Sequence, residues 1–145
     1  MKVKIQYLNG KAIKPEYATA GSAGMDLCAA MDNPVELRVG GRVMIPTGIA
    51  MQIPEGYGGF IFPRSGLAYK KGISMANCVG VIDSDYTGEI QVVLHNISGH
   101  DYTVNPGDRI AQIVFLPVGM AELCEVEELE ETRRGTGGFG STGER

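Results

Sequence analysis

The amino-acid sequence predicts an all-β domain, and three observations carry this prediction. Short runs of alternating apolar and polar residues recur along the chain, which is typical of strands with one buried face. Turn signals rich in Gly, Pro, Asn and Asp separate these runs. Residues 65–71 are the only segment with helical character, and the segment is short. About ten short strands at this spacing indicate a β-sandwich, a jelly roll or a barrel.

The alternation can be followed in order along the chain. Before the helix, it predicts strands at residues 3–7, 35–39, 42–45, 49–53 and 57–62. Ser65 is a suitable residue to cap the helix that follows. After the helix, strands are expected at residues 73–75, 89–95, 102–104, 109–116 and 122–126. Turns at residues 9–10, 40–41, 54–56, 98–99 and 105–108 connect these elements.

Length and composition indicate one globular domain with a short extension. The chain has 145 residues, of which 43% are hydrophobic, so it can bury a core. We expect a β-domain over residues 1–126, followed over 127–145 by an acidic linker and a flexible glycine-rich arm. The net charge of −4 argues against nucleic acid as a partner. No apolar run approaches the roughly 20 residues of a membrane span.

The cysteines indicate a reducing compartment. Cys28, Cys78 and Cys124 are odd in number, far apart and not arranged as Cys-x-x-Cys. This pattern argues against a disulfide framework and a zinc site, and it favours the cytoplasm. Because all three lie in apolar segments, the sequence favours core positions for them.

The C-terminal residues carry the most informative pattern. Residues 133–143 read Arg-Arg-Gly-Thr-Gly-Gly-Phe-Gly-Ser-Thr-Gly. Glycine amides, hydroxyls and arginines are the donors that phosphate groups need, and Phe139 offers a flat face to a nucleobase. No Lys follows the glycines, so the segment is not a P-loop. It is interpreted either as a flexible lid that closes over a nucleotide or as an unstructured glycine-rich tail.

Two further segments contain charged residues at unusual places. Asp26 lies inside the apolar segment 23–27, where it is either a metal-anchoring carboxylate or an ordinary edge or turn aspartate. Arg64, Ser65 and Gly66 follow a proline that ends a strand. They form either an anion site at the start of the helix or a capped helix start that binds nothing.

Segments 77–89 and 106–113 also contain candidate site residues. The first is an apolar run that meets an acidic turn, and we expect a hairpin that holds Asp83 and Tyr86 on rigid elements. In the second, Gln112 interrupts an apolar strand that follows a Pro-Gly-Asp turn. A buried amide must find partners, so Gln112 binds either backbone or ligand.

In this order, the five segments closely resemble the five motifs of the trimeric deoxyuridine triphosphatases (dUTPases). Gly-x-Ile-Asp-x-x-Tyr-x-Gly at residues 80–88 and Arg-Gly-x-Gly-Gly-Phe-Gly-Ser at residues 134–141 are the most specific of them. The resemblance extends from residue 23 to residue 143. It implies the dUTPase-like β-clip form of the jelly roll. It also implies hydrolysis of dUTP to dUMP and pyrophosphate, which keeps uracil out of DNA and supplies dUMP for thymidylate synthesis.

The resemblance also implies a role for each matching residue. Asp83 resembles the general base that activates a water to attack the α-phosphorus, and Asp26 resembles the residue that holds Mg²⁺ through a water. Tyr86 is expected to stack under the deoxyribose and to leave no space for a 2′-hydroxyl. The uracil is expected to be read by Asn77 and the backbone of Gly80, Val81 and Ile82, and covered by Phe139. The expected phosphate contacts are Arg64, Ser65, Gly66, Gln112, Arg134, Gly140, Ser141 and Thr142.

Members of this family act as homotrimers whose active sites are shared between subunits and capped by a neighbour's tail. The resemblance therefore implies dUTP and further copies of the chain as partners, with no nucleic acid and no membrane. Two alternatives remain: a dCTP deaminase-like enzyme of the same fold, and a non-catalytic nucleotide-binding or interaction module. The hairpin at residues 80–86 and Phe139 favour the pyrophosphatase over the deaminase. A mere binding module would have no need for both Asp83 and Asp26.

Overall fold

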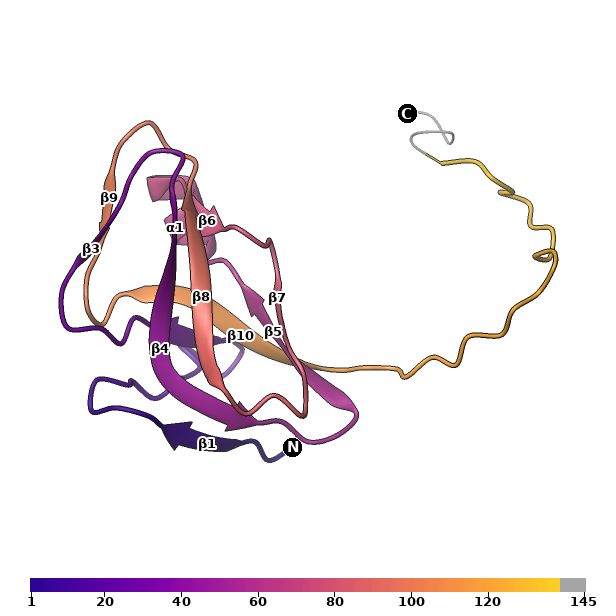
Figure 1. The fold of residues 1–145 in the computed structure, drawn as a ribbon, viewed down its shortest axis with the longest axis horizontal. Helices are drawn as coiled ribbons and strands as arrows, with labels where there is room; N and C mark the ends of the chain where they lie inside the picture. Colours follow the sequence, from indigo (N-terminus) through magenta and orange to yellow (C-terminus); the bar gives the residue numbers. More distant parts are fainter. Residues whose placement is uncertain (139–145) are drawn as a thin grey trace.

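The computed structural model describes residues 1–138 and confirms an all-β domain (Figure 1). Within these residues every strand pairing is antiparallel, and one short helix interrupts the series of strands. The elements are β1 (Lys4–Tyr7), β2 (Met25–Cys28), β3 (Val35–Leu37), β4 (Arg42–Gln52), β5 (Tyr57–Phe62), α1 (Ser65–Lys71), β6 (Ile73–Met75), β7 (Gly80–Ile82), β8 (Glu89–Asn96), β9 (Tyr102–Val104) and β10 (Arg109–Pro117).

The strands form two four-stranded sheets and a two-stranded ribbon. The sheets have the strand orders β1-β4-β8-β6 and β2-β10-β5-β7, and β3 pairs with β9. Alternate residues of the two sheets form one buried cluster, to which Ile45 and Val92 contribute from the first sheet and Ile61 and Ile113 from the second. The apolar positions of the alternating pattern are therefore the core positions.

The strands predicted at residues 42–45 and 49–53 are one strand, β4. The predicted break corresponds to an irregularity, because the pairing of β4 with β8 shifts register between Pro46 and Ala50. Gly48 has φ +68°, a left-handed conformation that favours glycine. Its N–H donates to the carboxylate of Glu89 at 2.9 Å, and the hydroxyl of Thr47 donates to the carbonyl of Ile90 at 2.5 Å. Hydrogen bonds that involve the Thr47 and Glu89 side chains thus replace part of the backbone hydrogen bonding between β4 and β8 at this bulge.

Three expectations from the sequence are wrong. Arg64, not Ser65, occupies the N-cap position of α1, and its side chain makes no capping hydrogen bond. Residues 122–126 form no strand, because a strand needs a neighbour for its backbone groups and no segment within residues 1–138 pairs with them. Cys78 and Cys124 are exposed rather than buried, and Cys28 is only partly buried.

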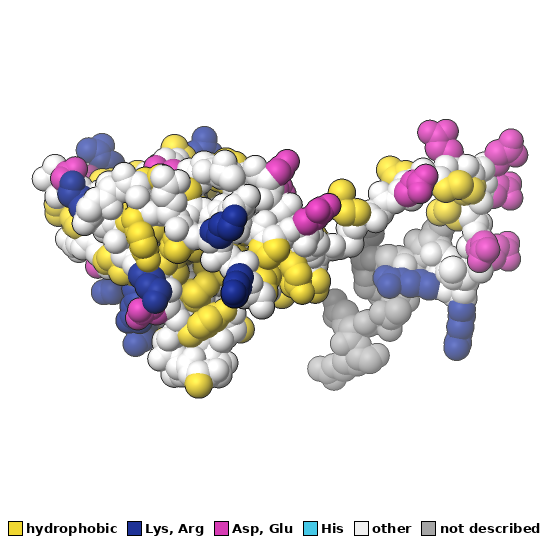
Figure 2. All heavy atoms as spheres, turned by 90° about the horizontal axis from the view of Figure 1, so that it is seen from below, with side chains coloured by type: hydrophobic (Ala, Val, Ile, Leu, Met, Phe, Trp, Pro, Cys, Tyr) yellow, Lys and Arg dark blue, Asp and Glu magenta, His cyan; other side chains and the backbone are white. Residues whose placement is uncertain are grey.

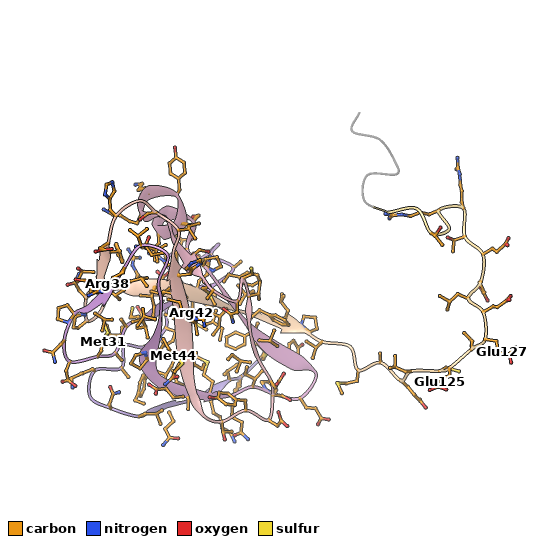
Figure 3. All side chains as sticks on the ribbon, turned by 45° about the horizontal axis from the view of Figure 1, so that its top comes forward. Met31, Arg38, Arg42, Met44, Glu125 and Glu127 are labelled. Atoms are coloured by element: carbon orange, nitrogen blue, oxygen red, sulfur yellow. The ribbon has the colours of Figure 1, made fainter. Side chains whose placement is uncertain are left out.

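Residues 118–138 form a tail that leaves the domain after β10 (Figure 1). It carries no helix or strand, and acidic side chains stand along it, including Glu125 and Glu127 (Figures 2 and 3). Apolar side chains are exposed among them: Met120 is 94% exposed and Leu123 is 91% exposed. In the described part of the chain, no helix is long and apolar enough to cross a membrane.

Candidate functional site

The first part of the site is a set of polar residues at one end of the second sheet, which we call the cationic cluster: Asp26, Arg64, Ser65, Gly66, Arg109 and Gln112. The strand register brings its members together. Asp26 of β2 lies opposite Gln112 of β10, which lies opposite Phe62 of β5. Arg64 follows β5 by two residues and so reaches the same end of the sheet.

Two arginines bind the carboxylate of Asp26. Arg64 Nε lies 2.8 Å from Asp26 Oδ1, and Arg109 Nη1 lies 3.1 Å from Oδ2. The Asp26 side chain is only 19% exposed, so it is a partly buried anion that needs such partners. Two guanidinium groups and one carboxylate leave the cluster with a net positive charge, which suits an anionic ligand.

Gln112 and the start of α1 complete the cluster. Gln112 Nε2 donates to the carbonyl of Pro63 at 3.2 Å, so in this structure the amide uses a backbone partner and supports the loop that carries Arg64. Without a side-chain cap, the amides of Ser65 and Gly66 have no intrahelical acceptors. These residues line a cavity of about 280 Å³ together with Asp26, Arg64 and Gln112.

The burial of this region also affects Cys28, two residues from Asp26 on β2. Burial raises the pKa of its thiol, and the nearby negative charge of Asp26 raises it further. Cys28 is therefore a poor source of thiolate near neutral pH.

The second part of the site, which we call the hairpin half-site, is the segment from Asn77 to Tyr86. It begins with a tight turn, in which Val79 N–H donates to the carbonyl of Asn77 at 2.6 Å around Cys78, whose φ is +60°. Strand β7 follows and is the outermost strand of its sheet, so one edge of its backbone is unpaired in the described chain.

The acidic turn after β7 holds Asp83 and Tyr86. The N–H of Tyr86 donates to the carbonyl of Asp83 at 3.2 Å, and the Tyr86 hydroxyl donates to the carbonyl of Glu89 at 2.9 Å. Asp83 is exposed, and no hydrogen bond or ion pair to its carboxylate occurs within residues 1–138. Asp83 and Tyr86 line a hollow of about 200 Å³ with Val81 and Ile82.

The structure does not bring the two parts together within one chain. Strand β7 pairs with β5 so that Ile82 lies opposite Gly59, and the next residue, Asp83, is level with Gly58. Arg64 lies six residues further along β5 and its extension. At roughly 3.3 Å per residue, about 20 Å separates them. No residue lines both cavities.

The remaining predicted residues belong to the tail. Arg134 contacts neither part of the site; its Nε donates to the carbonyl of Gly137 at 2.8 Å. Phe139, Gly140, Ser141 and Thr142 lie outside the described residues.

Arg109 is the site residue that the sequence analysis missed. It was visible in Pro-Gly-Asp-Arg at residues 106–109, a turn that places an arginine at the first position of β10. Its partner Asp26 is 83 residues away in sequence, so only the fold reveals the ion pair.

An antiparallel all-β fold with a cationic cavity and a separate acidic hairpin defines a class of all-β proteins suited to an anionic ligand. A model of the dUTPase family matches residues 10–143. The deoxyuridine 5′-triphosphate nucleotidohydrolase of Desulfitobacterium hafniense is 53% identical over 146 residues, covering 99% of this chain and 97% of that protein. The protein of the same name from Wolinella succinogenes is 49% identical, covering 99% and 95%. The chain therefore belongs to the dUTPase family.

Solved structures agree with this assignment. A mutant dUTPase of Staphylococcus bacteriophage 80alpha, with dUpNHpp, has a TM-score of 0.90 and 29% identity, covering 98% of each chain. A mutant dUTPase from phage phi11 of S. aureus has a TM-score of 0.82 and 27% identity, covering 90% of this chain and 100% of that one. That structure is described as revealing the coordination of a structural Mg(II) ion.

Proposed function

We propose that this protein hydrolyses dUTP to dUMP and pyrophosphate by attack of water on the α-phosphorus. The observation that carries the proposal is a cationic cavity together with a hairpin whose exposed aspartate has no side-chain partner within residues 1–138, in a chain of the dUTPase family. Hydrolysis would keep uracil out of DNA and supply dUMP for thymidylate synthesis.

In this proposal the cationic cluster binds the triphosphate. The chain has a net charge of −4, so a highly charged anion needs local positive groups. Arg64 and Arg109 supply these groups, while the free amides of Ser65 and Gly66 donate to phosphate oxygens. Gln112 holds the Arg64 loop from behind or contacts phosphate directly.

Asp83 is the proposed general base. Its carboxylate accepts a proton as the water oxygen bonds to the α-phosphorus and the bond from that phosphorus to the bridging oxygen breaks. Pyrophosphate leaves with the bridging oxygen, and Asp83 later releases the proton to solvent. Because the carboxylate is exposed and no described residue pairs with it, it is free to accept a hydrogen bond from that water.

The residues of this site fit a Mg²⁺ ion that is held mainly by the nucleotide phosphates rather than by the protein alone. No group of three or more His, Cys, Asp or Glu side chains that could hold a metal occurs within residues 1–138. Both oxygens of Asp26 already accept from arginines, but each has a further lone pair that can accept from a metal-bound water. Bound there, the ion would neutralise phosphate charge.

We also propose that the working enzyme is a homotrimer in which the two halves of each active site come from different copies. Water attack requires Asp83 within a few ångströms of the phosphate, whereas about 20 Å separates Asp83 from Arg64 along one chain. The exposed apolar side chains of the tail support burial against a neighbour. The tail of another copy would then bring Phe139 over the base and Arg134, Gly140, Ser141 and Thr142 to the γ-phosphate.

The hairpin half-site would select the base and the sugar. One edge of β7 is unpaired within residues 1–138 and offers backbone donors and acceptors, so Gly80, Val81 and Ile82 can read uracil with the help of Asn77. A close fit would exclude the methyl group of thymine, and cytosine presents the reverse donors and acceptors. Tyr86 would exclude the 2′-hydroxyl of UTP.

The cytoplasm is the proposed location. All three cysteines are free thiols, and Cys78 and Cys124 are exposed, a combination that suits a reducing compartment.

The decisive experiment measures pyrophosphate release with Mg²⁺ from dUTP, beside dCTP, dTTP and UTP. Release from dUTP alone supports both the reaction and the proposed selectivity. Ammonia release from dCTP would support the deaminase instead. Binding of dUTP without any product would leave a non-catalytic module as the better account.

A further inference from the structure

Tyr86 lies against the backbone of Gly88 more closely than any side chain at position 88 would allow. A Cβ placed on Gly88 would be 2.6 Å from the Tyr86 hydroxyl oxygen, 2.7 Å from Cζ and 3.0 Å from Cε2. Such distances are far below van der Waals contact, so the ring occupies the space that a side chain at position 88 would fill. Gly88 does not have a left-handed φ, so alanine is compatible with the backbone there.

The same end of the ring also makes a hydrogen bond. The Tyr86 hydroxyl donates to the carbonyl of Glu89 at 2.9 Å, while the Tyr86 N–H closes the turn to Asp83. Without these contacts the ring would be poorly held, because the residue is 44% exposed. Two contacts, one steric and one polar, therefore determine the position of the ring.

Glu89 is itself anchored to the bulge in β4. Its Oε1 accepts from the N–H of Gly48 at 2.9 Å, and its Oε2 accepts from Gln91 Nε2 at 3.2 Å. The hydroxyl of Thr47 also donates to the carbonyl of Ile90, the next residue of β8. The start of β8, and with it the acceptor for the Tyr86 hydroxyl, is thereby fixed to β4.

We infer that Gly88 and Glu89 are positioning residues that seat the Tyr86 ring and so set the enzyme's preference for a deoxyribose over a ribose. The inference rests on the proposed function, in which Tyr86 packs under the sugar. Neither residue needs to touch the nucleotide. Gly88 provides the space for the ring, and Glu89 provides the hydrogen-bond acceptor that keeps it there.

The test is Gly88→Ala, with kcat and KM measured for dUTP and for UTP. The methyl group displaces the ring toward solvent, because the far end of a tyrosine moves more easily than the backbone. We expect the ratio of kcat/KM for dUTP to that for UTP to fall about tenfold or more, chiefly through a higher KM for dUTP. An unchanged ratio, or an equal loss for both substrates, would overturn the inference.

The matched control is Gly99→Ala, because within residues 1–138 no atom beyond the two neighbouring residues lies within 4 Å of a Cβ at that position. Its melting temperature and kinetics should equal those of the wild type. If Gly88→Ala does not fold, Tyr86→Phe tests the polar contact alone. Removing the hydroxyl should lower the ratio about threefold while the ring stays over Gly88. A ratio unchanged in this variant counts against Glu89 as the anchor.

Adding Gly88→Ala to Tyr86→Ala distinguishes an effect of Gly88 through the Tyr86 ring from an independent structural role. If Gly88 acts through the ring, the second substitution changes the ratio no further. If Gly88→Ala lowers the ratio as much in the Tyr86→Ala background as in the wild type, Gly88 has an independent structural role. That result would overturn the inference but not the proposed function. A dUTP preference that survives Tyr86→Ala would overturn the proposed sugar contact, and the inference with it.

Discussion

The cationic cluster and the hairpin half-site are built by different means. In the cluster, charged side chains hold one another, with Asp26 fixed between Arg64 and Arg109. In the hairpin, backbone turns and one close contact fix the side chains, and the carboxylate of Asp83 has no partner within residues 1–138. Charge therefore organises the cationic cluster, which binds phosphate, whereas backbone turns organise the hairpin half-site, which selects the nucleoside and carries the general base.

The largest effect on turnover is expected from a substitution in the hairpin half-site. Asp83→Asn keeps the shape of the hairpin but removes the proton acceptor, so turnover should fall by about 10³-fold or more. Binding of dUTP should be nearly unchanged in a titration with a non-hydrolysable analogue, because the cationic cluster is intact. Normal turnover would remove Asp83 from its role.

Removal of residues 133–145 tests whether two half-sites suffice without the lid. The last strand of the described chain ends at Pro117, so the truncated protein should remain folded and assembled. We expect kcat to fall about 100-fold, because the donors to the γ-phosphate are lost. Size-exclusion chromatography and circular dichroism serve as controls, and an unaffected rate would exclude the lid.

Complementation tests whether the halves come from different copies. Asp83→Asn and Arg64→Ala each inactivate one half-site, so neither variant alone should exceed about 1% of wild-type activity. Co-expressed in equal amounts, they should recover about a quarter of it, because a quarter of the shared sites pair two intact halves. Activity no greater than that of the separate variants would place the whole site in one chain.

A smaller effect is expected for Arg109→Gln. Arg109 is more exposed than Arg64, so its contribution is screened by water, and the KM for dUTP should rise about fivefold. Arg38→Gln is the matched control, because Arg38 is exposed and pairs with Glu36 on β3, outside both half-sites (Figure 3). An equal change in both variants would indicate a general effect of net charge.

The smallest difference between the two parts of the site is expected in the reactivity of their cysteines. At pH 8, iodoacetamide should alkylate the exposed Cys78 of the hairpin faster than Cys28 beside the cluster. Burial and Asp26 raise the pKa of the Cys28 thiol, so its reactive thiolate fraction is small at pH 8 and keeps increasing above pH 9. Peptide mass mapping over time measures both rates. Faster reaction at Cys28 would contradict the assigned burial.

Local patterns in the sequence predicted the fold well. The bounds of α1, β5, β6 and β9 agree with the predicted segments. Pro63 separates β5 from α1, Gly72 separates α1 from β6, and the turns at residues 98–99 and 105–108 flank β9. The break at Thr47 and Gly48 suggested two strands, but contacts with Glu89 and Ile90 bridge the bulge and keep β4 continuous. The strand predicted at residues 122–126 is absent because its alternating pattern has no partner strand within residues 1–138.

The site was predicted less completely. The motifs pointed to Asp26 and Arg64, but nothing in their order along the sequence gives the pairing of Arg109 with Asp26. Nor does motif order reveal that Asp83 and Arg64 lie at opposite ends of β5, since this depends on the antiparallel register of β7. Long-range pairing is a property of the folded sheet rather than of any local pattern.

The length of β5 has a genetic consequence. If each active site joins halves from two copies, a copy that is defective in both halves inactivates two sites, each of which it shares with another copy. A variant that assembles but lacks both Arg64 and Asp83 would leave only a quarter of sites intact at equal expression, on the statistics of random assembly. Such an allele would be partially dominant over the wild type, whereas an allele whose product fails to fold would be recessive.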